Sequence, residues 1–171
     1  GLEMIFRVAA ALIFTAIGGV IGYSLADRLR EAKRICSGIG QLFHKAEYYI
    51  CRRGDDVYTF CRKLKEDKHL ACLGFVQLLP DEYRFGADFH KQWQEAVEKG
   101  FQGNNEELSL ILQFGEILGR SDSAAQLKSI QNLERELEAI ENMRSEALLK
   151  KGRLYRGTGL LFGVMAGILV L

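Results

Sequence analysis

The sequence predicts an all-α protein in which a helical bundle lies between two apolar helices that span a membrane. Two uncharged apolar runs lie at residues 8–26 and 157–171 of the 171-residue chain. The segment between the runs repeats apolar residues at helical spacing and never sustains the alternation typical of a strand. We therefore expect an N-terminal transmembrane helix (1–26), an antiparallel bundle of six helices (27–153) and a C-terminal transmembrane helix (154–171).

The first apolar run, VAAALIFTAIGGVIGYSLA at 8–26, has the length needed to cross about 30 Å of hydrocarbon. An alternative interpretation is a signal peptide, because Ser24–Leu25–Ala26 has the small-x-small pattern of a cleavage site. The single Arg7 before the run and the basic cluster RLREAKR after it argue against export.

The second apolar run is shorter, and it spans only if Leu154 and Tyr155 are included and Arg156 reaches the interface. A buried core helix is the alternative, although glycine is a poor residue for one. Both runs carry glycines four residues apart, which let helices pack closely in lipid, against each other or against partner proteins. Background glycine frequency is the other explanation. These residues are Gly18, Gly22, Gly159, Gly163 and Gly167.

Basic residues predict the orientation. They follow the first run and precede the second, so the positive-inside rule puts the bundle in the cytoplasm and both termini outside. In that reducing compartment the four cysteines are expected to be free thiols. The basic residues are Arg28, Arg30, Lys33, Arg34, Lys150, Lys151, Arg153 and Arg156, and the thiols are Cys36, Cys51, Cys61 and Cys72.

The first helix is expected to continue from the membrane to Arg52, with Gly54 as its C-cap. Asp55 or Asp56 caps a second helix that carries residues 57–64. A third helix is predicted over 70–79, where Leu70, Leu73, Val76 and Leu79 recur, and it stops at Pro80. The fourth carries Phe85, Phe89, Trp93 and Val97, four residues apart, and Gly100 closes it.

The fifth helix starts at a cap formed by Asn104 or Asn105, with acidic residues in its first turn. Gly115 and Gly119 are unusual in its apolar stripe, because each glycine costs about 1 kcal/mol relative to alanine. We expect Gly115 to allow close approach of two backbones and Gly119 to end the helix with a positive φ. Ser121–Asp122–Ser123 then starts a sixth helix over 124–153, where Ser123 and Gln126 have capping-box spacing. Its heptad positions are Ile130, Leu133, Leu137, Ile140, Arg144 and Ala147.

No catalytic, metal or cofactor site is predicted. The formal net charge of +1 gives no field for nucleic acid. The phosphate-loop, HExxH and GxSxG motifs are absent from the sequence. His69 and Cys72 are one turn apart, but two ligands are too few for zinc, and His44 and His90 are isolated in sequence. We therefore expect a protein that is not an enzyme.

Several segments resemble the stage III sporulation protein AB family. They are QFGEILGRSD at 113–122, then Gln126, the helix with Leu133 and Leu137, the Lys150–Lys151 pair, YRGTGLLFG at 155–163, and RLREAKR after the first run. The motif at the helix turn consists of Gln113, Phe114, Gly115, Glu116, Leu118, Gly119 and Asp122.

The resemblance implies a platform protein of the stage III A complex, in the mother-cell membrane around the forespore. It implies a bundle similar to the platform domain of type II secretion F and type IV pilus proteins. The implied partners are other stage III A proteins, including the AA-type cytoplasmic ATPase, and membrane lipid. Two turns at the far end of the predicted bundle are expected to expose Arg52, Arg53 and Arg120, which are candidate ATPase contacts. The alternative is that both turns are ordinary solvated helix caps.

Two other classes stay open. A membrane-anchored regulator or sensor would bind another protein or a small ligand through the bundle. An exported lipid-interacting protein would require cleavage after the first run.

Overall fold

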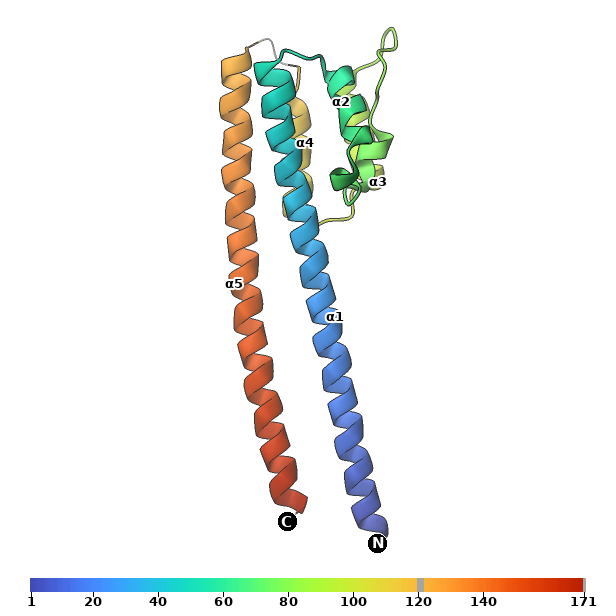
Figure 1. Cartoon of the computed structure of the whole chain (residues 1–171), viewed down its shortest axis with the longest axis vertical. Helices are drawn as coiled ribbons and strands as arrows, with labels where there is room; N and C mark the ends of the chain where they lie inside the picture. Colours follow the sequence, from blue (N-terminus) through green and yellow to red (C-terminus); the bar gives the residue numbers. More distant parts are fainter. Residues whose placement is uncertain (120–121, 171) are drawn as a thin grey trace. The chain divides into compact units, whose positions relative to one another are not determined.

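The computed structural model describes residues 1–119 and 122–170, and all regular structure in this part of the chain is helical (Figure 1). Nothing is described of several side chains between 11 and 25, or of those from 152 onward. The α-helices are α1 (Leu2–Ala46), α2 (Val57–Glu66), α3 (Phe89–Gly100), α4 (Asn105–Ile117) and α5 (Ser123–Val170). A π-helical segment η1 (Glu47–Arg52) extends α1, and two 3₁₀ segments, η2 (Lys68–Leu70) and η3 (Gly74–Leu78), follow α2. The all-α prediction is confirmed for the described residues.

The chain forms two compact units. The first contains Gly1–Glu31 and Asn142–Leu171, and the second contains Ala32–Glu141. In the first unit the backbone is helical through α1 and α5, as the two apolar runs predict. Among the residues whose side chains are described, no helix combines the length and apolar character needed to cross a bilayer. The environments of Gly18, Gly22, Gly159, Gly163 and Gly167 lie outside the described residues.

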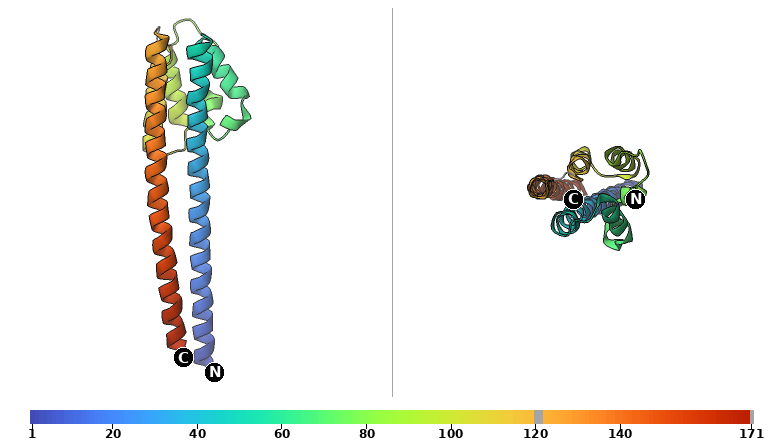
Figure 2. Two further views of the ribbon diagram at one scale, coloured as in Figure 1. Left: turned by 60° about the vertical axis from the view of Figure 1, so that its left-hand side comes forward. Right: turned by 90° about the horizontal axis from the view of Figure 1, so that it is seen from above.

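The core of the second unit lies between the end of α1, the start of α5 and the three shorter α-helices. The end of α1 and the start of α5 lie side by side in Figure 1 and in the turned view on the left of Figure 2. The helical spacing predicted this burial, because apolar residues three and four apart share one face. The predicted stripes are buried at Ile35, Ile39, Leu42, Ala46 and Ile50, and at Ile130, Leu133, Leu137 and Ile140.

Asp56 caps the N-terminus of α2, as the sequence predicts. Its Oδ1 accepts hydrogen bonds from the Tyr58 and Thr59 backbone N–H groups at 2.9 and 3.0 Å, and its Oδ2 accepts one from Thr59 Oγ1 at 2.6 Å. The Thr59 hydroxyl, followed by the backbone N–H groups, lowers the pKa of Asp56. The ionised carboxylate therefore stabilises the first turn of α2.

We expect Asp56→Ala to lower the free energy of unfolding by about 1 kcal/mol at pH 7, because two helix N–H groups lose their acceptor. A carboxyl with a lowered folded-state pKa contributes stability above its unfolded pKa of about 3.9, and this contribution disappears as the pH falls further. The difference in unfolding free energy between wild type and Asp56→Ala should therefore become smaller below about pH 4. Chemical denaturation of both proteins from pH 7 to pH 3 measures it. Asp56→Asn, which keeps an acceptor but does not ionise, is the control, and a gap independent of pH would contradict the charge contribution.

The helix predicted over 70–79 is absent, and η2 and η3 replace it. The predicted core residues are nevertheless buried at Leu70, Leu73, Val76 and Leu79. They recur every third residue, which matches the repeat of a 3₁₀-helix more closely than the 3.6-residue repeat of an α-helix. Leu73 breaks the segment with φ −96° and ψ 85°, so an α-helix cannot continue through it. The apolar positions were correct, and the helix type was wrong.

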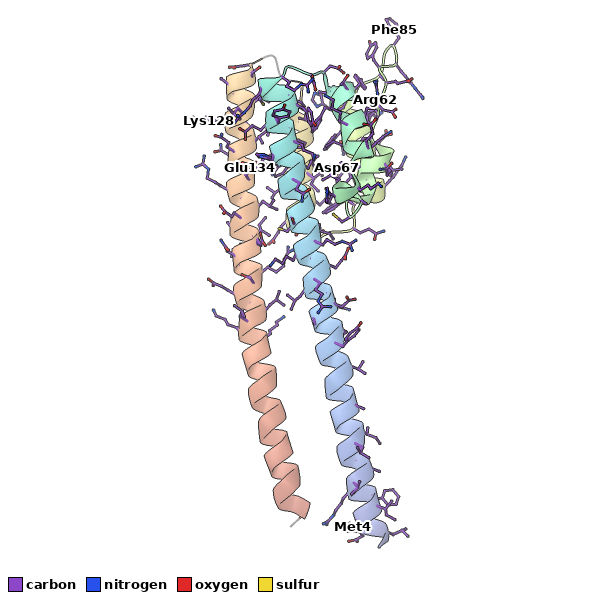
Figure 3. The ribbon with its side chains drawn as sticks, in the orientation of Figure 1. Met4, Arg62, Asp67, Phe85, Lys128 and Glu134 are labelled. Carbon is purple, nitrogen blue, oxygen red and sulfur yellow. The ribbon has the colours of Figure 1, made fainter. Side chains whose placement is uncertain are left out.

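The fourth predicted helix begins one turn later than expected. Asp88 caps α3 by accepting a hydrogen bond from the His90 N–H at 2.9 Å, and Gly86 before it has φ 79°. Phe85 is fully exposed in the loop ahead of α3 and lies away from the helices of the second unit (Figure 3). The Gly86–Asp88 start signal therefore outweighs the four-residue spacing of Phe85 and Phe89.

α4 and α5 begin close to the predicted positions. The Asn104 N–H donates to Glu107 Oε2 at 3.1 Å, which confirms the cap at Asn104. Asp122 caps α5, since its Oδ1 accepts from the Ala124 and Ala125 N–H groups at 3.0 and 3.2 Å. The capping-box assignment for Gln126 was wrong, because its side chain is buried and donates to Ile117 O at 3.0 Å. Gln126 thus ties the start of α5 to the end of α4.

Candidate functional site

Two turns of the second unit lie next to each other. One joins η1 to α2 and contains Gly54, and the other joins α4 to α5 and contains Gly119. Cys51 Sγ in η1 lies 4.0 Å from Gln126 Oε1 in α5. A Cβ placed at Gly119 would lie 3.6 Å from Val57 Cγ1 at the start of α2. Both glycines have positive φ, 73° and 80°, so each turn reverses the chain in a backbone conformation that glycine favours.

Arg52 and Arg53 give the first turn a cationic surface. Their side chains are 68% and 52% exposed. Arg52 Nη2 lies 2.6 Å from Glu47 Oε1, and Arg53 Nε lies 3.8 Å from Asp55 Oδ1. The Arg53 guanidinium also lies 5.9 Å from the centre of the Tyr49 ring. Arg120, the third predicted contact, lies outside the described residues.

The motif at 113–122 is divided between the core and the surface. Phe114 and Leu118 are fully buried, and the Phe114 ring centroid lies 4.9 Å from Phe43 and 5.5 Å from Trp93. Gln113 and Glu116 are exposed, and Gln113 Nε2 donates to Ser109 Oγ at 3.2 Å. The motif thus combines core packing with an exposed polar edge beside the α4–α5 turn.

Gly115 accommodates a side chain of α3. A Cβ at Gly115 would overlap the indole of Trp93, with Nε1 2.6 Å away. Trp93 Nε1 donates to Ile111 O at 3.0 Å, and His90 Nδ1 lies 2.9 Å from Gly115 O, where the Nδ1–H tautomer donates. The close approach expected at Gly115 is therefore made by an indole ring against one helix, and not by two backbones. No local pattern indicated that Trp93 is the partner.

None of the four cysteines forms a disulfide, and two of them are poor candidates for thiolate chemistry. Burial raises the pKa of Cys61 to about 12, and burial followed by the charge of Glu47 raises the pKa of Cys51. A thiol must ionise to act as a nucleophile or a strong metal ligand. Cys72 Sγ lies 3.6 Å from Arg34 O and 3.7 Å from His69 O, so the thiol hydrogen-bonds to backbone carbonyl oxygens.

Within the part of the chain that the structure describes, one group of three side chains could hold a metal ion. It consists of His44 in α1, Glu47 in η1 and Glu134 in α5, whose ligand atoms all lie within 4.8 Å of one another. His44 and Glu134 line a groove of about 940 Å³ between α1 and α5. The sequence showed His44 as isolated, because Glu134 reaches it only through the fold.

Comparison with known proteins indicates the family. The model of the stage III sporulation protein AB family matches residues 7–171, which is nearly the whole chain. The chain belongs to this family. Family membership supports a role as a component of a stage III sporulation complex.

A solved structure titled stage III sporulation protein AB shares the fold. The two are 21% identical with a TM-score of 0.53, and the match covers 70% of this chain and 97% of that chain. At this identity the likeness shows the fold alone. No curated protein matched the sequence. The resemblance stated from the 113–122 motif and the basic clusters is confirmed at the level of the stage III sporulation protein AB family.

Proposed function

We propose that the chain is a non-enzymatic platform component of the stage III A complex, in the mother-cell membrane around the forespore. In this proposal residues 27–153 face the cytoplasm and contact the complex's AA-type ATPase. The observation that carries it is the family match over residues 7–171. The near-neutral charge fits a protein partner and not nucleic acid.

The membrane anchors are proposed from the sequence of residues 1–26 and 154–171, parts of which lie outside the described residues. The run at 8–26 contains no charged residue, and α1 continues through it without a break. Likewise, α5 continues through the second run to Val170. Glycines four residues apart in both runs suit close helix packing in lipid.

The basic clusters beside the two runs predict the topology. Arg28 to Arg34 and Lys150 to Arg156 should stay on the cytoplasmic side, because positive residues near spans resist translocation. Reporter fusions inserted at Gly54 and placed after Leu171 should therefore report opposite sides of the membrane. Detection of the Gly54 fusion on the outer side would refute the topology.

The contact with the ATPase is proposed at the two adjacent turns, through Arg52, Arg53 and Arg120. Exposed charges at the rim of an interface act mainly on the association rate and its salt dependence. We expect the triple charge reversal to Glu to slow association with the AA-type ATPase on the order of tenfold at low salt, with a smaller effect at high salt. The measurement is surface-immobilised binding of the chain to the purified ATPase at two salt concentrations.

Two controls separate loss of contact from loss of fold. Reversal of Lys91 and Lys99, which are exposed on α3, should leave binding unchanged. The thermal midpoint of the triple variant should stay close to wild type, because exposed ion pairs such as Arg52–Glu47 contribute little stability. Full binding by the triple variant at low salt would place the interface elsewhere, such as the acidic face of α5 around Glu134, Glu138 and Glu141.

A further inference from the structure

We propose that His44, Glu47 and Glu134 form a binding site for a divalent transition-metal ion of the zinc type, which joins the end of α1 to the start of α5. The proposed ligands differ from the residues of the ATPase contact, although Arg52 of that contact also hydrogen-bonds to Glu47. It concerns the second unit alone, because all three residues belong to Ala32–Glu141.

The geometry of the three side chains suits a small divalent ion. Their ligand atoms lie within 4.8 Å of one another. Zinc–nitrogen and zinc–oxygen bonds of 2.0–2.2 Å place tetrahedral ligands about 3.3–3.6 Å apart. Binding of the ion therefore requires the side chains of His44, Glu47 and Glu134 to move closer together.

The donor set is one imidazole and two carboxylates. Nitrogen and oxygen donors of this kind bind zinc and its neighbours, whereas calcium and magnesium prefer oxygen ligands alone. Three protein ligands leave a fourth position for water or another side chain. Glu138 lies one helical turn after Glu134 and lines the same groove, so it is an additional carboxylate on that face of α5.

Two of the three ligands come from one continuous helical segment, α1 and η1. His44 and Glu47 are three residues apart and therefore share a face. Glu47 is also the first residue of the π-helical segment η1. Glu134 completes the group from α5, and Figure 3 labels it on that helix.

The charges at the group favour a cation. Glu47 and Glu134 are two carboxylates whose ligand atoms lie within 4.8 Å of each other. The two carboxylates therefore repel each other in the absence of a cation, and a divalent ion removes that repulsion. Arg52 Nη2 lies 2.6 Å from Glu47 Oε1, so the guanidinium orients this carboxylate and offsets part of its charge.

The groove gives the ion a path from solvent. It holds about 940 Å³ and is lined by His44, Glu134, Gln131 and Glu138 among others. His44 is exposed and Glu134 is half-buried. An ion can therefore enter and exchange without unfolding of α1 or α5, and a chelator can remove it.

The test uses the untagged chain, stripped with a chelator and titrated with Zn²⁺ by calorimetry and with Co²⁺ by visible absorption. We expect one equivalent to bind, and the Co²⁺ ligand-field bands to show a low coordination number. His44→Ala and Glu134→Gln should each weaken binding at least tenfold. His69→Ala is the matched control, because His69 is exposed and outside the group, and it should bind like wild type.

Thermal unfolding provides a second readout. Because the ion joins α1 to α5, Zn²⁺ should raise the midpoint of thermal unfolding of wild type and of His69→Ala. The same Zn²⁺ concentration should raise the midpoints of His44→Ala and Glu134→Gln much less. Failure of the stripped chain to take up one equivalent would overturn the proposal. Wild-type affinity in both ligand variants, or binding of Ca²⁺ in preference to Zn²⁺, would also overturn it. None of these outcomes bears on the ATPase contact.

Discussion

Gly115→Leu should lower the free energy of unfolding by about 1–3 kcal/mol or more, because overpacking a filled core forces its neighbours to move. The Trp93 indole already occupies the space that a Cβ would need, and it is almost fully buried. It is also held by its hydrogen bond to Ile111 O at 3.0 Å. Leucine adds three further carbons, so α3 and α4 must separate. Thermal and chemical unfolding measure the loss.

Gly40→Ala is the matched control for this substitution. Gly40 is also helical, but a Cβ there would meet only Leu137 Cδ2, at an ordinary 3.8 Å. Removing a glycine from a helix interior should then stabilise the protein by up to about 1 kcal/mol. Equal unfolding midpoints for Gly115→Leu and wild type would show that Trp93 does not pack against Gly115 in solution.

Trp93→Ala should have the largest effect of any single truncation proposed here, about 3–5 kcal/mol, as for other buried tryptophans. The Trp93 ring centroid lies 5.5–6.0 Å from the rings of Phe75, Phe89 and Phe114, which join η3, α3 and α4. The substitution removes these contacts and leaves a cavity among them. Chemical denaturation gives the change in unfolding free energy.

Phe85→Ala is the control for loss of aromatic area, because Phe85 is fully exposed and its removal should change stability by less than about 0.5 kcal/mol. A double-mutant cycle tests the Trp93–Gly115 contact itself. Gly115→Ala should be destabilising in wild type and much less so in the Trp93→Ala background, since the overlapping ring is gone. Additive effects would contradict a direct contact between the two positions.

The sequence by itself determined the helical class, the continuous helices at both ends and most of the caps. These features depend on neighbours within one or two turns. Asp56 accepts from backbone N–H groups two and three residues away, and Asn104 donates its own N–H to the Glu107 side chain. Gly119 has the positive φ that follows the end of α4. The buried stripe of α5 likewise follows from a regular spacing.

Local patterns failed where two interpretations compete within a few residues. Leu70, Leu73 and Val76 were recognised as core residues, but the same spacing serves an α-helix and a 3₁₀-helix, and tertiary packing selected the latter. Phe85 had the correct spacing for α3, yet the Asp88 cap began the helix after it. Burial was therefore predictable at three of these positions, and helix type was not.

Only the tertiary structure decided which distant residues meet. Gly115 is a glycine because Trp93 of another helix fills its space, and no periodicity within α4 contains that information. His44 and Glu47 gain Glu134 as a neighbour only when the start of α5 returns alongside the end of α1. Contacts between helices depend on how whole faces pack, so they arise from the fold and not from the spacing of residues along one segment.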